Sequence, residues 1–199
     1  LFHPYGERLH FGRATLATCA RLFPEAGFRH AAEDLAEQAA WWLGEPALRA
    51  ETPAAAPRTS TLLPDAGLAV MKAGETHIVI DCGPFGAGNA GHRHAGVLGL
   101  SAWRGDQEIL IDPGTFTYVG DARLRDWFRG TAAHNTIRIG GLDQATPAGP
   151  FRWINLPEVT VRSWRQTPDS VRLDASCRYR GLTHRRRFLL LEQEELLLI

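Results

Sequence analysis

The sequence has little of what marks several large classes of protein. It holds a single lysine, Lys72, and its 22 basic and 22 acidic side chains cancel to no formal net charge. A chain without excess positive charge lacks the field that attracts nucleic acid or an anionic membrane, so neither is an expected partner. The three cysteines, Cys19, Cys82 and Cys177, are widely spaced and odd in number. They supply neither a disulfide framework nor a paired-cysteine metal site.

Long apolar runs are missing as well. No stretch approaches the roughly 18 residues that a membrane-spanning helix needs, and no secretory signal is recognisable. The only methionine is Met71, the chain begins at Leu1, and it stops inside the apolar run 196–199. We therefore expect this chain to be a piece of a longer protein.

Helical periodicity marks the first quarter of the chain. In residues 1–50 apolar side chains recur every three or four positions, first in 13–23 and then from Phe28 to Trp42. This spacing predicts a hairpin of two helices. Residues 51–61 are mostly Ala, Pro, Thr and Ser, and we expect a linker there.

From residue 62 to residue 199 the period becomes that of strands. Short runs of β-branched and aliphatic residues are separated by Gly, Pro, Asp and Asn, which is typical of a sandwich of two sheets. The runs are 68–71, 77–80, 108–111, 136–139, 159–161, 171–173 and 187–190. Because no helical repeat stands between them, the sheets should be antiparallel. The predicted fold class is therefore α+β, a short helical hairpin followed by a mainly antiparallel β-sandwich.

Four residues in the polar, glycine-rich middle of the chain are candidates for one site. His92 and His94 are two positions apart, so on a strand both side chains would point to the same face. Asp112 follows an apolar run, where a carboxylate is costly unless it is paired or bound to metal. His134 is expected to open the strand 136–139, with its side chain on the face opposite the core.

These residues allow two readings. Two imidazoles and one carboxylate that leave a fourth position open are a common zinc set. The remaining histidine, His92 or His94, would then act as a base or as a further ligand. The same residues also fit a polar network without metal, in which the segment 112–114 is only a turn.

The same stretch offers side chains suited to a sugar. The planar fork of arginine matches a carboxylate or a sulfate, although each arginine here also suits a solvated surface position. Three arginines stand between Asp112 and His134, namely Arg123, Arg125 and Arg129. Tryptophan can stack on sugar rings, but in a sandwich it usually belongs to the core.

Several linked motifs between residues 63 and 153 resemble the heparinase II/III-like family, which consists of polysaccharide lyases and relatives such as oligoalginate lyases. The segments that carry the resemblance occur in the family's order: 63–67 (LPDAG), 81–84 (DCGP), 91–95 (GHRHA), 111–118 (IDPGTFTY) and 129–136 (RGTAAHNT). The family pairs an incomplete α/α toroid with a following antiparallel β-sandwich. The resemblance therefore implies that residues 1–50 are the last toroid helices and that 62–199 is the sandwich, truncated at its C-terminal end.

The resemblance also implies a site and a reaction. His94, Asp112 and His134 fall on the zinc positions, and His92 falls on the active-site histidine that faces the cleft. The reaction is β-elimination at a uronic acid of a glycosaminoglycan or of alginate, in a periplasmic or secreted protein. We expect Tyr118 beside His92 in catalysis, and we expect the substrate to be bound by Arg125, Arg129 and Asn135.

This sequence departs from the family pattern at two positions. Gly96 stands where an acid is usual, and Phe116 stands where the family often has tyrosine. The tyrosine acid/base belongs to the toroid and would lie upstream of Leu1, so we expect this fragment alone to be inactive. Two alternatives stay open: a non-catalytic relative that keeps the zinc site as a structural staple, and an unrelated metal-dependent β-fold enzyme.

Overall fold

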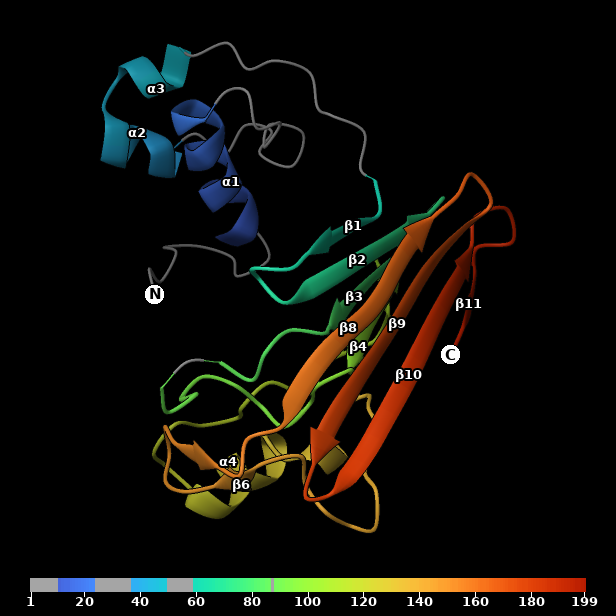
Figure 1. Ribbon diagram of the computed structural model, residues 1–199. Helices are drawn as coiled ribbons and strands as arrows, with labels where there is room; N and C mark the ends of the chain where they lie inside the picture. Colours follow the sequence, from blue (N-terminus) through green and yellow to red (C-terminus); the bar gives the residue numbers. More distant parts are fainter. Residues whose placement is uncertain (1–10, 24–36, 50–58, 87) are drawn as a thin grey trace. The chain divides into compact units, whose positions relative to one another are not determined.

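The computed structural model describes residues 11–23, 37–49, 59–86 and 88–199, and the chain divides into two compact units, 1–58 and 59–199 (Figure 1). The second predicted helical stripe up to residue 36, and residues 51–58 of the predicted linker, lie outside the described residues. Thr61, expected in that linker, is already paired with Val70 in the first strand. None of the described helices is long and apolar enough to cross a membrane.

The first unit contains the helices α1 (Phe11–Leu22), α2 (Glu37–Leu43) and α3 (Pro46–Arg49). The predicted helix 13–23 is thus confirmed to within two residues. Small side chains, Ala17 and Ala39 among them, are fully buried in these helices. The helix α2 ends where Gly44 adopts a left-handed φ of 81°, as expected of a C-terminal stop.

The second unit is built from two main antiparallel sheets (Figure 1). One has the order β1-β2-β3-β4-β5, with β1 (Thr61–Leu63), β2 (Leu68–Ala73), β3 (Thr76–Asp81), β4 (Leu100–Arg104) and β5 (Gln107–Leu110). The other has the order β11-β10-β9-β8, with β8 (Glu158–Gln166), β9 (Ser170–Tyr179), β10 (Leu182–Leu191) and β11 (Leu196–Leu198). Between β5 and β8 come α4 (Ala122–Phe128), the 3₁₀ turn η4 (Thr131–Ala133) and a small ribbon of β6 (Thr146–Pro147) and β7 (Trp153–Ile154). The predicted antiparallel β-sandwich is confirmed.

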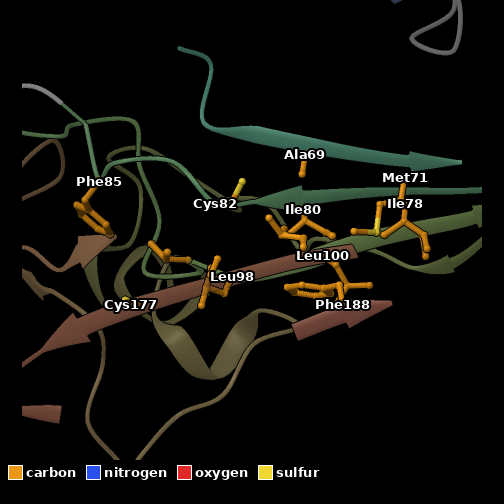
Figure 2. Close-up of a cluster of buried hydrophobic side chains, with 14 of the residues drawn as sticks. Ala69, Met71, Ile78, Ile80, Cys82, Phe85, Leu98, Leu100, Cys177 and Phe188 are labelled. Carbon is orange, nitrogen blue, oxygen red and sulfur yellow. The ribbon is translucent and has the colours of Figure 1, made fainter. Parts of the chain in front are cut away.

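The core lies between the two main sheets (Figure 2). Alternate residues of β2, such as Ala69 and Met71, are fully buried, and β10 contributes Phe188 and Leu190 from the opposite sheet. The loop before β4 adds Val97 and Leu98. This alternation is what fixes which side of each strand faces the core, and it leaves the other face for the site.

Two local predictions are wrong. Residues 136–139 form no strand, since only an isolated bridge joins Ile139 to Leu142, and Ile137 is 49% exposed. The glycines at 140 and 141 both adopt left-handed φ angles and turn the chain back at once. His92 and His94 lie on no strand either, because the loop 82–99 continues until β4 begins at Leu100.

Candidate metal centre

A cavity of about 250 Å³ opens on the face of the first sheet that is turned away from the core. Side chains that alternate along the strands with core residues line it, among them Val79, Asp81 and Ser101. Three segments outside the strands complete the lining: the loop 82–99 after β3, the segment that follows β5, and the residues after η4. These segments carry the predicted site residues.

His94, Asp112 and His134 meet in this cavity, one from each segment. A ligand-type atom of each lies within 4.8 Å of those of the other two. Nδ1 of His134 is 2.7 Å from a carboxylate oxygen of Asp112, and the rings of His94 and His134 are 5.3 Å apart between centroids. The structure therefore assembles the three predicted ligands into a possible metal-binding group.

The surroundings favour the protonation states in which His94 and Asp112 bind metal. Burial, and next the neighbouring His134, lower the pKa of His94 to about 4, so this imidazole is neutral at pH 7. Burial alone would raise the pKa of Asp112, but hydrogen bonds from His134 and from the backbone N–H of Gly114 outweigh it and lower that pKa. Neutral imidazole and ionised carboxylate are the forms that coordinate a cation.

The second ring nitrogen of His134 tests whether a metal fits. Nε2 is buried and has no hydrogen-bond partner among the described residues, whereas Nδ1 is held by Asp112. A buried polar atom without a partner is rare and costly. A metal-binding histidine commonly has a carboxylate on its other ring nitrogen, so a cation on Nε2 would complete this arrangement. The residues present therefore fit a metal.

Gly96 packs directly against the His134 ring. A Cβ at position 96 would lie 2.8 Å from Cγ of His134 and within 3.1 Å of two further atoms of that side chain. Position 96 accordingly has no room for a side chain while His134 keeps its place. The acid that the family resemblance leads one to expect at this position is excluded here by steric contact.

His92 and Tyr118 lie next to each other. Both side chains are exposed, their ring centroids are 6.4 Å apart, and both rings contact Phe151, at 5.9 and 5.7 Å. His92 also lines the cavity that contains His94 and His134. The two residues predicted to act in catalysis thus share one surface, and His92 joins it to the metal-binding group.

Arg125 and Arg129 point into the protein. Arg125 is 2% exposed, and its guanidinium lies 4.8 Å from the ring centroid of Tyr118 and 5.1 Å from that of Phe151. Arg129 is fully buried, pairs with Asp126 and donates to neighbouring backbone carbonyls. Arg125 thus supports the loop that carries Tyr118, while Arg129 holds residues 149–150. Both leave almost no surface for a ligand.

Asn135 also holds the structure together. Its side-chain amide donates to the carbonyls of Leu100, at 3.1 Å, and Ile111, at 2.8 Å. It thereby links β4 to the residue that precedes Asp112. Asn135 lines the cavity as well, so it is the one member of the predicted substrate-binding set that does so.

Two residues that the sequence analysis did not single out hold the loops of the site. Gln144 is fully buried and pairs with both backbone groups of Val97, at 2.8 and 3.0 Å. Arg186, in β10, donates to the carbonyls of Leu98 and Asn135. For Arg186 a signal was present, since alternation places this cation on the same strand face as the core residues Phe188 and Leu190. For Gln144 no local signal exists, because its partner is 47 residues away.

Comparison with known proteins identifies the fold. The structure is similar to that of a heparan sulfate lyase, HepC from Pedobacter heparinus, with 20% identity and a TM-score of 0.67. The match covers 94% of this chain and 26% of that one. The chain also matches a heparinase III, with 17% identity, a TM-score of 0.62 and coverage of 94% of this chain and 27% of that one. The chain thus spans about a quarter of the length of these structures. A search of curated proteins found no match.

The sequence itself assigns the family. The profile described as "Heparinase II/III-like, C-terminal" matches residues 55–199, which include both main sheets and every residue of the candidate metal centre. The chain belongs to the heparinase II/III-like family, of which it contains the C-terminal domain.

Proposed function

We propose that this chain is part of a polysaccharide lyase that cleaves a uronic-acid-containing polysaccharide, of the glycosaminoglycan or alginate type, by β-elimination. The observation that carries the proposal is the position of His92, exposed beside the His94–Asp112–His134 group in a member of the heparinase II/III-like family. Heparan sulfate is named for the lyase from Pedobacter heparinus, so it is the first substrate to test. A periplasmic or secreted location is part of the same proposal.

The metal in this proposal is one zinc ion. Two imidazoles and a carboxylate are borderline ligands that suit zinc, and the solvent-exposed side of Asp112 leaves room for a further ligand. Zinc held by His94 and His134, with Asp112 as a further ligand or as the group that orients the His134 ring, would chiefly anchor the three segments that frame the cavity. Its place beside His92 would make it a structural support of the catalytic surface.

The reacting groups of this chain are His92 and Tyr118. β-Elimination needs the negative charge at the substrate carboxylate to be neutralised while the C5 proton is removed, because the C5–H is a very weak acid. His92 can donate a hydrogen bond to that carboxylate or take part in proton transfer, and Tyr118 stands within reach of the same ligand surface. The acid/base that protonates the leaving oxygen is proposed to come from an upstream toroid domain, so residues 1–199 alone would be inactive.

The test is the formation of unsaturated uronate, which absorbs ultraviolet light. The chain together with its toroid is mixed with heparan sulfate, other glycosaminoglycans and alginate, and absorbance is followed. We expect a signal with at least one substrate and its loss in His92→Ala. His77→Ala is the matched histidine control, since the ring of His77 contacts that of Trp103 and His77 does not line the cavity. A signal from residues 1–199 alone would contradict the proposed origin of the acid/base.

A second function is favoured by Phe116. This side chain is 65% exposed and has no hydroxyl group where the family often carries a tyrosine. A non-catalytic carbohydrate-binding or structural relative that keeps zinc as a staple would bind the metal and give no unsaturated product with any substrate of the panel.

A further inference from the structure

One arginine of the second sheet reaches both histidine-bearing loops of the metal centre. Arg186 lies on β10, and its Nη1 donates to the carbonyl oxygen of Leu98 at 2.7 Å and to that of Asn135 at 2.8 Å. Leu98 belongs to the loop of His94, and Asn135 directly follows His134. The two acceptors are 88 and 51 residues away from Arg186 along the chain.

The side chain of Arg186 lies where a positive charge loses much of its hydration, which costs free energy. Residues two positions away on either side, His184 and Phe188, are buried, so Arg186 occupies the inner face of its strand. Burial lowers the pKa of its guanidinium, and its Nε is buried without a hydrogen-bond partner among the described residues. Among the described residues no carboxylate forms an ion pair with Arg186. An apolar side chain here would avoid the desolvation cost, so packing alone does not account for arginine.

The backbone that Arg186 holds is itself unusual. Leu98 has a left-handed φ of 60°, which a branched residue adopts only under restraint. Its own N–H donates to the carbonyl of Asp81 at 2.7 Å, and the next residue, Gly99, donates to Gly96 at 2.8 Å. This tight turn sets the place of Gly96, and Gly96 in turn packs on the His134 ring.

We propose that Arg186 is a positioning residue of the metal centre: its guanidinium clamps the turn 96–99 to the backbone after His134 and so fixes the two histidines relative to each other. The inference rests on the proposed function only in taking the metal to be zinc. Groups that orient ligands without touching the metal typically contribute about 10- to 100-fold to its affinity. The same range is expected for Arg186.

The variant is Arg186→Met, which keeps the length of the side chain and removes the charge and the donors. The matched control is Arg187→Met, the neighbouring position, whose side chain is 71% exposed on the other face of the strand. Arg186→Lys, which keeps a cation with donors, serves as the conservative variant. Zinc affinity is measured by competition with a chromophoric chelator on the purified proteins. We expect Arg186→Met to bind about 10- to 100-fold more weakly, Arg186→Lys to lie between it and the wild type, and Arg187→Met to be unchanged.

A readout without metal separates this inference from the function. The backbone amides of Leu98, Gly99 and Thr136 donate to the carbonyls of Asp81, Gly96 and His134. Their hydrogen exchange should be faster by about an order of magnitude in Arg186→Met. Amides of β9 should exchange as in the wild type. Unchanged exchange in both loops, or an equal acceleration across β9, would overturn the inference. If the wild type binds zinc no better than His134→Ala, the zinc proposal fails, and loop exchange still decides whether Arg186 is the clamp.

Discussion

At the scale of single residues, His134 carries the most information, because its two ring nitrogens have different surroundings. One is bonded to Asp112 and the other is buried without a partner. A ring in this state is prepared for a ligand on its free nitrogen. Asp112 acts either as a ligand itself or as the group that orients the ring, and in both roles its removal weakens metal binding.

We predict that His134→Ala loses stoichiometric zinc, since the metal-binding group is then left with the imidazole of His94 and the carboxylate of Asp112. Asp112→Ala should weaken zinc binding at least about tenfold, through loss of a ligand or of the orienting hydrogen bond. Metal content after dialysis is measured by elemental analysis. Asp106→Ala removes an exposed carboxylate in the turn between β4 and β5 and should change nothing. Equal zinc in Asp112→Ala and the wild type would remove Asp112 from the site.

The cysteines allow a second prediction at this scale. Burial raises the pKa of Cys82 to about 11 and that of Cys177 to about 12, so both thiols stay protonated and inaccessible near pH 8. Cys19 is only half-buried. Alkylation of the native protein should modify Cys19 alone, and alkylation in denaturant should modify all three, as read by peptide mass spectrometry. Native labelling of Cys177 would show that the core opens more readily than its packing indicates.

At the scale of elements, the start of β2 and the end of β3 meet through two glycines. A Cβ on Gly67 would lie 2.4 Å from Cα of Gly83, and the reverse contact is 2.3 Å. The N–H of Cys82 donates to the carbonyl of Gly67 at 2.9 Å, so neither backbone can withdraw without losing a hydrogen bond. The loop that carries His92 and His94 begins at this contact.

We predict that Gly67→Ala destabilises the second unit by about 2–3 kcal/mol, because the added methyl group meets backbone and not a flexible side chain. Gly105→Ala is the matched control. Gly105 also has a left-handed φ, 57°, but its Cβ would meet nothing within 4 Å, so only the conformational cost of about 1 kcal/mol remains. Urea unfolding measures both. Equal destabilisation would mean that the close approach of the two strands relaxes at no cost.

Elements were predictable from the sequence where alternation is supported by burial. The runs that became β2, β3, β9 and β10 alternate because one face of each packs in the core. Polar and apolar residues alternate just as well in 136–139. There, however, the hydroxyl of Thr136 donates to the carbonyl of Val97, and Ile137 is exposed. Local pattern alone cannot distinguish these cases, because the difference lies in whether a neighbouring strand is present.

The site was predictable in composition but not in geometry. The linked motifs indicated His94, Asp112 and His134, and the structure brings these residues together. The strand expected to align His92 with His94 does not exist, and their shared cavity results from a loop. Arg125 was expected at the substrate, but the tertiary fold turns its side chain inward onto Tyr118. Contacts of this kind join segments far apart in sequence and have no local signature.

At the scale of the whole molecule, residues 59–199 form a compact unit with a hydrophobic core of its own. All residues of the candidate metal centre also lie within it. We predict that residues 59–199, produced alone, unfold cooperatively with nearly the thermal midpoint of the full chain. They should also bind zinc in the same ratio to protein. Calorimetry and elemental analysis test this, and a non-cooperative transition would show that the first unit completes the fold.

The contact between Gly96 and the His134 ring also constrains how this site can change in evolution. An acid at position 96 would be a fourth potential ligand, but its first carbon already overlaps the ring. Such a substitution is tolerated only after the loop of His134 has moved, so the order in which the two changes occur is fixed. A single substitution of Gly96 by an acid therefore displaces His134 in this protein. The same substitution would be neutral in a relative whose histidine lies farther from position 96.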